Sequence, residues 1–348
     1  MPLKILPKES VPLFVDNLLR DYEVIGPLRK DGFYVFGSVR SFSDMELDYP
    51  ITIYPAKKFF LPPRESLLRF KTGEKVSVEP VVEEPQPKVL FGLHPCDLHS
   101  TWLLDAAFLQ ETPDASYEAR RRHTVFVGLD CLKPCDEYAF CKDMGTLYVN
   151  GGYDLFLTDI GDAYAVDIGS RRGEEMLERY ADTREPTPSE LERLEAAHKE
   201  KEENFSNRLK FDIHNLPAIL WNSYDSPYWE ELAQKCLGCG SCTLVCSTCY
   251  CFDVFDKVEL NLQKGERIRV WDSCLLEEFA KVAGGLNFRP SRVERLRHRF
   301  FRKGKYLTER FGKVGCVGCG RCTRNCLVHI NPIEVYNHIY EEQQKSAA

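Results

Sequence analysis

No hydrophobic run in this 348-residue sequence approaches the ~20 residues that a membrane-spanning helix needs. An excess of positive charge is missing as well, because 46 Lys and Arg residues face 53 Asp and Glu residues, for a net charge of −7. A dedicated nucleic-acid binder carries a basic face, so we expect no nucleic-acid partner. The N-terminal residues contain neither a long apolar run nor a small-residue cleavage site, which predicts a cytoplasmic rather than a secreted protein.

The dinucleotide-binding fingerprint G-x-G-x-x-G is also missing, so the sequence shows no nucleotide site of that kind. Cysteine, by contrast, is abundant. The chain has 15 cysteines, and 11 of them lie between Cys236 and Cys326. In a chain without a secretion signal, such cysteines more often serve metal or redox chemistry than disulfides.

The remaining composition is that of a globular protein, with 43% hydrophobic and 28% charged residues, and the length suits roughly two domains. Short apolar runs alternate with helical spacing over residues 1–225, which predicts an α/β domain. We expect strands at 89–92, 124–128, 153–157 and 164–168, with a hairpin turn at Gly161 and Asp162 between the last two. Residues 226–348 are predicted to form a second, cysteine-rich domain.

A heavily charged helix is expected between these two domains, from about residue 189 to about residue 210. Ser189 would be its N-cap, and Glu192 three residues later would complete a capping box. The many charges predict a solvated surface helix that acts as a spacer.

One cysteine motif occurs twice, as Cys236-Leu-Gly-Cys239-Gly-Ser-Cys242-Thr-Leu-Val-Cys246 and as Cys316-Val-Gly-Cys319-Gly-Arg-Cys322-Thr-Arg-Asn-Cys326. Both copies have the C-x2-C-x2-C-x3-C spacing of bacterial-type ferredoxins with two [4Fe–4S] clusters. The glycines inside each copy let the loop fold tightly and present N–H groups to sulfur. Zinc is the weaker alternative, because its sites use two separated cysteine pairs, and disulfides are weaker still.

The fourth cysteine of each copy follows on a helix and points away from its own loop, so in two-cluster proteins it ligates the other cluster. We therefore predict cluster 1 on Cys236, Cys239, Cys242 and Cys326, and cluster 2 on Cys316, Cys319, Cys322 and Cys246. The 69 residues between the two copies keep an uncrossed alternative open, in which each cluster takes all four ligands from one copy. The second domain is thus expected to be an α+β two-cluster ferredoxin-like domain with a long helical insert.

Further motifs resemble one protein family, the iron–sulfur subunit that is called beta in sulfhydrogenases and A in anaerobic sulfite reductases. They are Cys246-Ser-Thr-Cys249-Tyr-Cys251-Phe-Asp253, Val270-Trp-Asp-Ser-Cys274, Val282-Ala-Gly-Gly-Leu-Asn287-Phe-Arg289-Pro290, Phe311-Gly-Lys-Val-Gly315-Cys316, His94-Pro-Cys96-Asp-Leu98 and Cys131…Phe140-Cys141-Lys-Asp-Met144-Gly145-Thr146. The resemblance covers most of residues 88–340.

The resemblance implies an electron-transfer subunit of an anaerobic, cytoplasmic oxidoreductase complex, without catalysis of its own. Its partners would be a flavoprotein subunit that binds NAD(P)H and a catalytic subunit, foremost a nickel–iron hydrogenase. An anaerobic sulfite reductase or another reductase complex is the alternative. A further alternative is that the chain itself reduces sulfur or polysulfide at Cys249, Cys251 or Cys274, which are weak catalytic candidates.

Seven cysteines lie outside the repeated motif. Four of them, in the N-terminal domain, follow predicted strands that would end at one edge of a parallel sheet, where α/β folds place ligands. These four could hold a third [4Fe–4S] cluster, or they could be thiols without metal; they are Cys96, Cys131, Cys135 and Cys141. The other three, Cys249, Cys251 and Cys274, could instead pack around a cluster or form a separate metal site.

A run of basic residues lies between the two cysteine motifs and contains Arg295, Arg299 and Arg302 at helical spacing. One interpretation is a solvated helix face. The other is a docking surface that attracts an acidic partner subunit or an acidic ferredoxin, and whose charge raises the potential of a nearby cluster.

Overall fold

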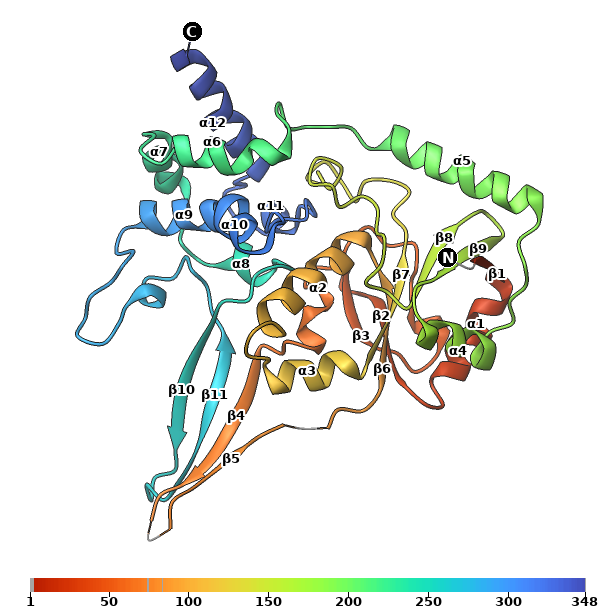
Figure 1. Cartoon of the computed structure of the whole chain (residues 1–348), viewed down its shortest axis with the longest axis horizontal. Coiled ribbons are helices and arrows are strands. Elements are labelled where there is room, and N and C mark those ends of the chain that lie inside the picture. Colours follow the sequence, from red (N-terminus) through yellow and green to blue (C-terminus); the bar gives the residue numbers. More distant parts are fainter. Residues whose placement is uncertain (1–2, 74, 83, 348) are drawn as a thin grey trace.

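The computed structural model describes residues 3–73, 75–82 and 84–347 (Figure 1). Its larger sheet has seven strands in the order β1-β9-β8-β7-β6-β2-β3. The bounds of these strands are β1 Leu3–Pro7, β2 Glu23–Lys30, β3 Phe33–Ser38, β6 Lys88–Leu93, β7 Thr124–Leu129, β8 Leu155–Asp159 and β9 Ala163–Ile168. The strands β2, β6, β7 and β8 are parallel, and the remaining pairs are antiparallel.

The strands at the centre of this sheet are continuous apolar runs, because both of their faces are covered. The predictions at 89–92 and 124–128 are confirmed within β6 and β7. The predicted hairpin is confirmed as β8 and β9, although β8 begins two residues later than expected. The helices of this part of the chain are α1 Val11–Leu18, α2 Pro95–Phe108, α3 Ala115–Arg122, α4 Arg171–Tyr180 and α5 Pro188–Asn204.

The charged helix α5 begins and ends earlier than its sequence suggested. Thr187, not Ser189, is the N-cap residue, and the Glu190 carboxylate accepts hydrogen bonds from the Thr187 N–H and hydroxyl at 2.9 and 2.8 Å. Pro188 then occupies the first helical position, where a missing N–H costs nothing. Both candidate capping boxes fit the sequence, and the proline selects the earlier one.

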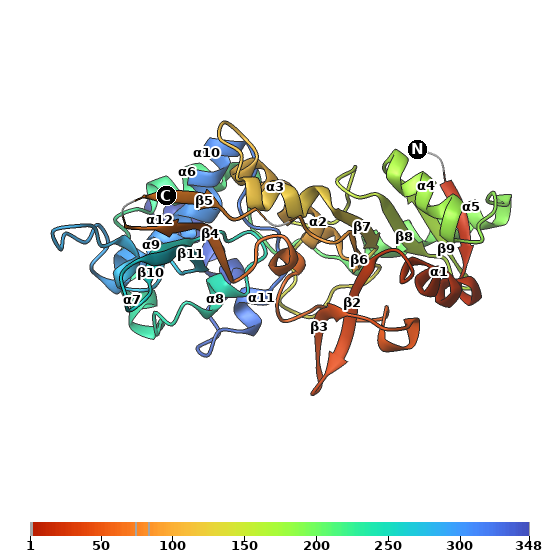
Figure 2. The same cartoon turned by 90° about the horizontal axis from the view of Figure 1, so that it is seen from below.

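A second sheet forms an arm that extends away from the body of the molecule (Figure 1), and Figure 2 shows it on the same side as the C-terminal helices. Its strands run in the order β10-β11-β4-β5 and comprise β4 Arg64–Lys71, β5 Ser77–Pro80, β10 Phe252–Val258 and β11 Lys264–Trp271. Two of these strands come from the insert between the cysteine motifs. A helical insert therefore describes only the later part of that segment, from Arg292 onward.

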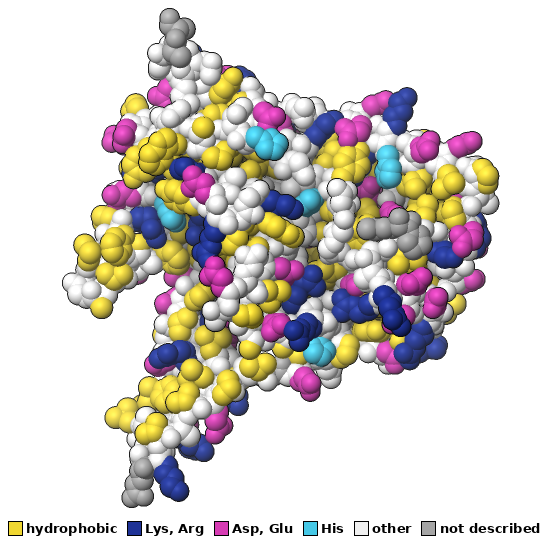
Figure 3. All heavy atoms as spheres, in the orientation of Figure 1, with side chains coloured by type: hydrophobic (Ala, Val, Ile, Leu, Met, Phe, Trp, Pro, Cys, Tyr) yellow, Lys and Arg dark blue, Asp and Glu magenta, His cyan; other side chains and the backbone are white. Residues whose placement is uncertain are grey.

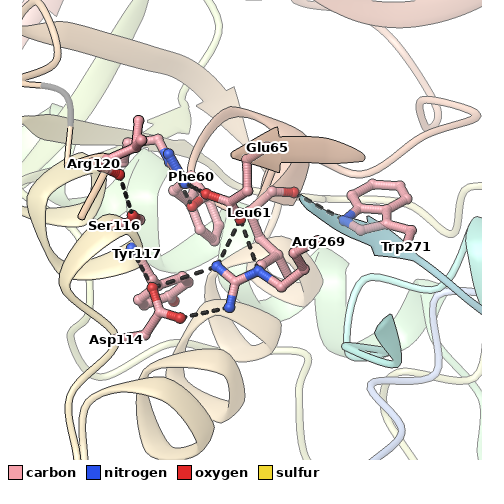
Figure 4. A network of polar contacts seen from close by, with 10 residues as sticks. Phe60, Leu61, Glu65, Asp114, Ser116, Tyr117, Arg120, Arg269 and Trp271 are labelled. Carbon is pink, nitrogen blue, oxygen red and sulfur yellow. Dashed lines mark hydrogen bonds and ion pairs between the residues drawn. The ribbon is translucent and has the colours of Figure 1, made fainter. Parts of the chain in front are cut away.

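Side chains at the base of the arm join it to α3 (Figure 4). Arg269 of β11 lies between the carboxylates of Glu65 and Asp114 and is 4% exposed. The indole N–H of Trp271 donates to the Leu61 carbonyl at 3.1 Å. The insert is thereby tied to residues about 200 positions earlier in the chain, so the arm connects the two predicted domains.

The C-terminal part packs its helices around Trp229, Phe300, Phe301 and Tyr336. These helices are α6 Leu216–Asn222, α7 Tyr228–Lys235, α9 Arg292–Phe301, α10 Leu307–Phe311 and α12 Pro332–Ala347, with the short helices α8 Ser241–Leu244 and α11 Arg321–Arg324 in the cysteine motifs. Over the described residues, no helix combines the length and the apolar character that crossing a membrane requires.

Candidate metal centres

The two cysteine motifs have the same backbone geometry. Gly238 and Gly318 have φ values of 66° and 67°, and Gly240 and Gly320 have φ values of 80° and 70°. In each copy the second of these glycines is the N-cap of the short helix that follows, α8 or α11. This left-handed backbone favours glycine, because a Cβ would clash with the following carbonyl. The sequence repeat is therefore a structural repeat.

One small cavity is lined by cysteines of both motifs: Cys236, Cys239, Cys242 and Cys326. Backbone N–H groups approach the sulfurs, since Gly238 donates to the Cys236 Sγ and Ile330 to the Cys326 Sγ, each at 3.4 Å. Burial raises the pKa of Cys242 to about 12. The charge of Arg299 lowers this pKa, whereas the charges of Cys322, Cys236 and Cys326 raise it. The cavity thus brings together the four residues that the spacing assigned to cluster 1, and we call them the first sulfur group.

A second group of sulfurs lies where α8 packs against α11. Its members are Cys246, Cys316, Cys319 and Cys322. Burial raises the pKa of Cys316 to about 12, and the charges of Cys322, Cys246 and Cys319 raise it further. Burial also raises the pKa of Cys319, with Cys246 again among its charged neighbours. Cys246 of the first motif therefore lies beside the thiols of the second motif.

A third group of sulfurs lies at the carboxyl ends of the parallel neighbours β6 and β7. Its members are the four N-terminal cysteines, Cys96, Cys131, Cys135 and Cys141. Cys96 is in the first turn of α2, and Cys131 is two residues beyond β7. Burial raises the pKa of Cys135 to about 12 and that of Cys141 to about 11, and the charges of Cys141 and Cys319 add to the increase in Cys135. The four N-terminal cysteines therefore approach one another and also approach the second group.

Two contacts hold the third group against the second motif. The Phe140 N–H donates to the Gly318 carbonyl at 2.8 Å, beside Cys141. The Arg321 guanidinium, which has no exposed surface, pairs with both carboxylate oxygens of Asp97 at 2.9 and 3.0 Å, directly after Cys96. A buried bidentate pair of this kind fixes both segments in one geometry. Sequence patterns alone missed the Arg321–Asp97 pair, because its partners are 224 positions apart.

The three remaining cysteines lie beside the second group. The thiols of Cys251 and Cys274 are in hydrogen-bonding contact, which lowers the pKa of Cys251 to about 6 against the cost of burial, with Arg302 and Lys303 lowering it further. Cys249 is in the same kind of contact with Cys246. The three weak catalytic candidates therefore belong to one thiol-rich region.

Buried cations surround these sulfurs. Lys57, Arg299 and Lys303 are at most 8% exposed, and within the described ranges no carboxylate lies at ion-pair distance from any of them. The Lys57 ammonium instead donates to the carbonyls of Cys246 and Cys249 at 2.8 and 2.6 Å. Burial lowers the pKa of Lys57 to about 8, while the neighbouring thiols act in the opposite direction. Buried charges require an opposite charge nearby, so these cations point to anionic sulfur.

The predicted docking arginines do not form an open basic face. Arg295 and Arg299 are each 8% exposed, and the Arg295 guanidinium donates to backbone carbonyls, including that of Leu275 at 3.0 Å. Arg302 is half-buried over the Tyr250 ring. Helical spacing identified one face of α9 and its continuation, but that face is turned inward, toward the cysteines.

The donor set fits [4Fe–4S] clusters at both repeated motifs, since each offers cysteines, N–H groups directed at sulfur and neighbouring buried cations. No group of three or more His, Cys, Asp or Glu side chains in the described part of the chain is arranged to hold a single metal ion.

The comparisons agree with the class of protein that this geometry defines, an iron–sulfur protein of the dicluster type. The family model for a 4Fe-4S dicluster domain matches residues 235–330. The sulfhydrogenase 2 subunit beta of Pyrococcus furiosus is 36% identical over 337 residues, which cover 97% of this chain and 98% of that protein. The chain therefore belongs to the iron–sulfur family of sulfhydrogenase beta subunits. No solved structure gives a significant match.

Proposed function

We propose that the chain is a cytoplasmic electron-transfer subunit of an oxidoreductase complex, with no catalytic centre of its own. Bound [4Fe–4S] clusters would supply one-electron redox chemistry, which the protein tunes and positions. The cavity shared by the two cysteine motifs carries this proposal, because crossed ligation places the two clusters side by side. Residues 226–348 would hold these clusters, and residues 1–225 would contribute to docking.

Crossed ligation is supported by the positions of the two fourth cysteines. Cys326 lines the cavity of the first motif, and Cys246 lies beside the thiols of the second. A third cluster on the N-terminal cysteines is supported by their convergence near Cys319. The sulfur groups would then form a series, in which the first is next to the second and the second next to the third.

The partners are proposed from the family. The relative is named as a subunit of a sulfhydrogenase, so a nickel–iron hydrogenase is the first candidate for the catalytic subunit. A flavoprotein that binds NAD(P)H is the proposed neighbour on the other side, and an acidic ferredoxin is a further candidate. Sulfite reductase remains the alternative complex.

The iron content of anaerobically purified protein tests the number of clusters. We expect about eight irons per chain for two clusters and about twelve for three, with equal acid-labile sulfide. Cys135→Ser should remove about four irons if the third cluster exists, whereas Cys249→Ser should remove none. A colourless protein without an EPR signal after reduction by dithionite would refute the electron-transfer function.

Paired variants test the crossed ligation. Cys326→Ser should disturb the same EPR signal as Cys239→Ser, and Cys246→Ser should disturb the same signal as Cys319→Ser. In the uncrossed arrangement the pairs would instead be Cys246 with Cys239 and Cys326 with Cys319. The two arrangements therefore give opposite pairings of spectra.

A second candidate function is the reduction of sulfur or polysulfide by this chain. The contact between Cys251 and Cys274 favours it, because a thiolate beside a second thiol can attack a sulfur–sulfur bond. The isolated, cluster-loaded chain should then reduce polysulfide with an artificial electron donor. Cys274→Ala should abolish that activity while leaving the iron content unchanged.

A further inference from the structure

Only one of the 15 cysteines is exposed, and it is Cys239. It belongs to the first sulfur group and lies between Gly238 and the N-cap glycine of α8. The thiols of the second group are half-buried, and those of the third are half-buried or buried. The first group is therefore the one whose sulfur comes nearest to solvent.

Exposed apolar side chains surround this sulfur and form what we call the apolar collar: Leu237, Leu276, Leu327 and Val328. Leu237 and Leu327 are 55% and 74% exposed, and both line the same cavity as Cys239. A Cβ placed on Gly240 would lie 3.7 Å from Leu276, so Leu276 borders the same loop. Single exposed leucines are ordinary, but a contiguous group is typical of a protein interaction site.

The turn that follows Cys326 keeps two members of the collar exposed. His329 has a φ of 51°, and the Ile330 N–H is directed at the Cys326 sulfur. The turn brings the Ile330 N–H to the Cys326 sulfur, and its geometry leaves the intervening Leu327 and Val328 on the surface. Polar residues would suit such a turn in a protein that exposes it to water. The apolar residues therefore indicate a surface that is covered in the assembled state.

A projecting loop extends the collar. The segment between β11 and α9 projects beside the helices in Figure 1, and Figure 3 shows hydrophobic side chains on it. Val282, Leu286 and Phe288 are 45%, 61% and 65% exposed. The loop is held by its own hydrogen bonds, since the Val282 N–H donates to the Leu286 carbonyl at 2.9 Å and the Asn287 amide to the Glu277 carbonyl at 2.7 Å. A structured loop with an apolar tip is preorganised for a partner.

The charge beside the collar restricts the partner. Arg292 is exposed, its Nε lies 4.0 Å from the position of a Cβ on Gly238, and within the described ranges it makes no ion pair. An interface with an apolar centre and a polar rim would pair this arginine with an acidic side chain. The exposed sulfur adds a second requirement, because electron exchange needs a redox group close to the first sulfur group.

We propose that the apolar collar and the projecting loop form the docking surface for a redox partner protein that carries a one-electron group. The partner would present an apolar face with an acidic side chain for Arg292, and its redox group would face Cys239. This inference rests on the proposed electron-transfer function and adds the side from which electrons enter or leave.

Site-specific photocrosslinking in the purified native complex tests the surface directly. With p-benzoylphenylalanine in place of Leu327, we expect a crosslink to a subunit that contains flavin or an iron–sulfur cluster. The same probe in place of Leu13, which is 58% exposed on α1, is the matched control and should give no such crosslink. A missing crosslink at 327, a crosslink to a second copy of this chain, or one to a protein without a redox group would overturn the proposal.

Charge substitution provides a second readout. The double variant Leu286→Asp/Phe288→Asp, on the projecting loop, should give at least a tenfold lower yield of the co-purifying redox subunit, whereas Leu13→Asp should not. The iron content and the reduction by methyl viologen should match those of the unmodified chain. An intact complex in the double variant would refute the docking surface. Absence of iron from the unmodified chain would instead refute the proposed electron-transfer function.

Discussion

At the scale of single residues, buried cations from distant parts of the chain lie nearest the sulfurs of the first and second groups. Lys57 precedes the first motif by 179 residues, and Arg299 and Lys303 follow from α9 and the turn after it. Arg299 is close to Cys242 of the first group and to Cys322 and Cys246 of the second. A positive charge in this position favours the reduced, more negative state of any cluster bound there.

Removing the Arg299 charge should therefore lower the midpoint potentials of both clusters. For Arg299→Met we expect a decrease of about 40 mV, which corresponds to about 1 kcal/mol for one electron. Potentiometric titration followed by EPR measures the shift. Arg299→Lys keeps the charge and should stay within about 15 mV of the unmodified protein; equal potentials in all three proteins would contradict this role.

A second prediction at this scale concerns the contact between the second motif and the third sulfur group. A Cβ on Gly318 would lie 2.6 Å from backbone atoms of Phe140 and Cys141, and the φ of 67° is itself unfavourable for alanine. Gly318→Ala should lower the free energy of unfolding by about 3 kcal/mol or more. Gly312 has a similar φ of 73° but open space around it.

Gly312→Ala is accordingly the control, with an expected loss of only about 1 kcal/mol from the backbone alone. Denaturant unfolding under anaerobic conditions measures both values. Equal losses in the two variants would mean that the close approach of the 138–141 segment to the second motif does not contribute.

At the scale of secondary-structure elements, α5 is attached to the sheet by a buried ion pair. The Lys201 ammonium contacts the Asp130 carboxylate at 2.5 Å and donates to the Leu147 carbonyl at 2.8 Å, with both ionic side chains 1% exposed. Asp130 in turn accepts a hydrogen bond from the Cys131 N–H at 2.9 Å. The sequence predicted a solvated spacer helix. Asp130 instead connects this helix to Cys131 of the third sulfur group.

Breaking this pair should be costly, because it leaves a buried carboxylate without a partner. For Lys201→Met we expect a loss of about 3–5 kcal/mol in the free energy of unfolding. The exposed Lys199 on the same helix supplies the control, and Lys199→Met should change stability by less than about 0.5 kcal/mol. The double variant Lys201→Met/Asp130→Leu should recover most of the loss; if Lys201→Met unfolds like the control, α5 is held by its other contacts.

At the scale of the whole molecule, the sulfur groups lie where the two halves of the chain meet. Arg321 of the second motif pairs with Asp97 at the start of α2, and Lys57 reaches the backbone of the first motif. The arm adds a third connection, through β4 and β11. Bound clusters would therefore stabilise the contact between the halves as well as the loops that hold them.

Removal of iron should consequently destabilise the whole molecule. Without anionic clusters, Lys57, Arg299 and Lys303 would be buried opposite thiols whose pKa values are mostly raised by burial. We expect a loss of several kcal/mol after anaerobic chelation, measured as a lower midpoint of unfolding. Iron and sulfide should restore the midpoint, and an unchanged midpoint in the iron-free chain would show that the cations are balanced in another way.

Local sequence patterns were sufficient for several features, because the interactions that produce them are local. The spacing of cysteine and glycine in each motif fixes the left-handed turns and the short helix, all within eleven residues. The apolar runs of β6 and β7 likewise predicted a parallel centre, since such strands are buried on both faces. The family resemblance rested on the same motifs and is shown by the comparisons.

Only the tertiary structure decided which distant segments meet. Cys326 reaches the cavity of Cys236, β11 pairs with β4, and Arg295 and Arg299 turn inward to the cysteines although their spacing also suited an open surface. Periodicity shows that a helix has a special face, but burial of that face depends on what the rest of the chain packs against it. The sequence likewise could not predict the charge balance around the sulfurs, because this balance depends on side chains that folding brings together from both halves of the chain.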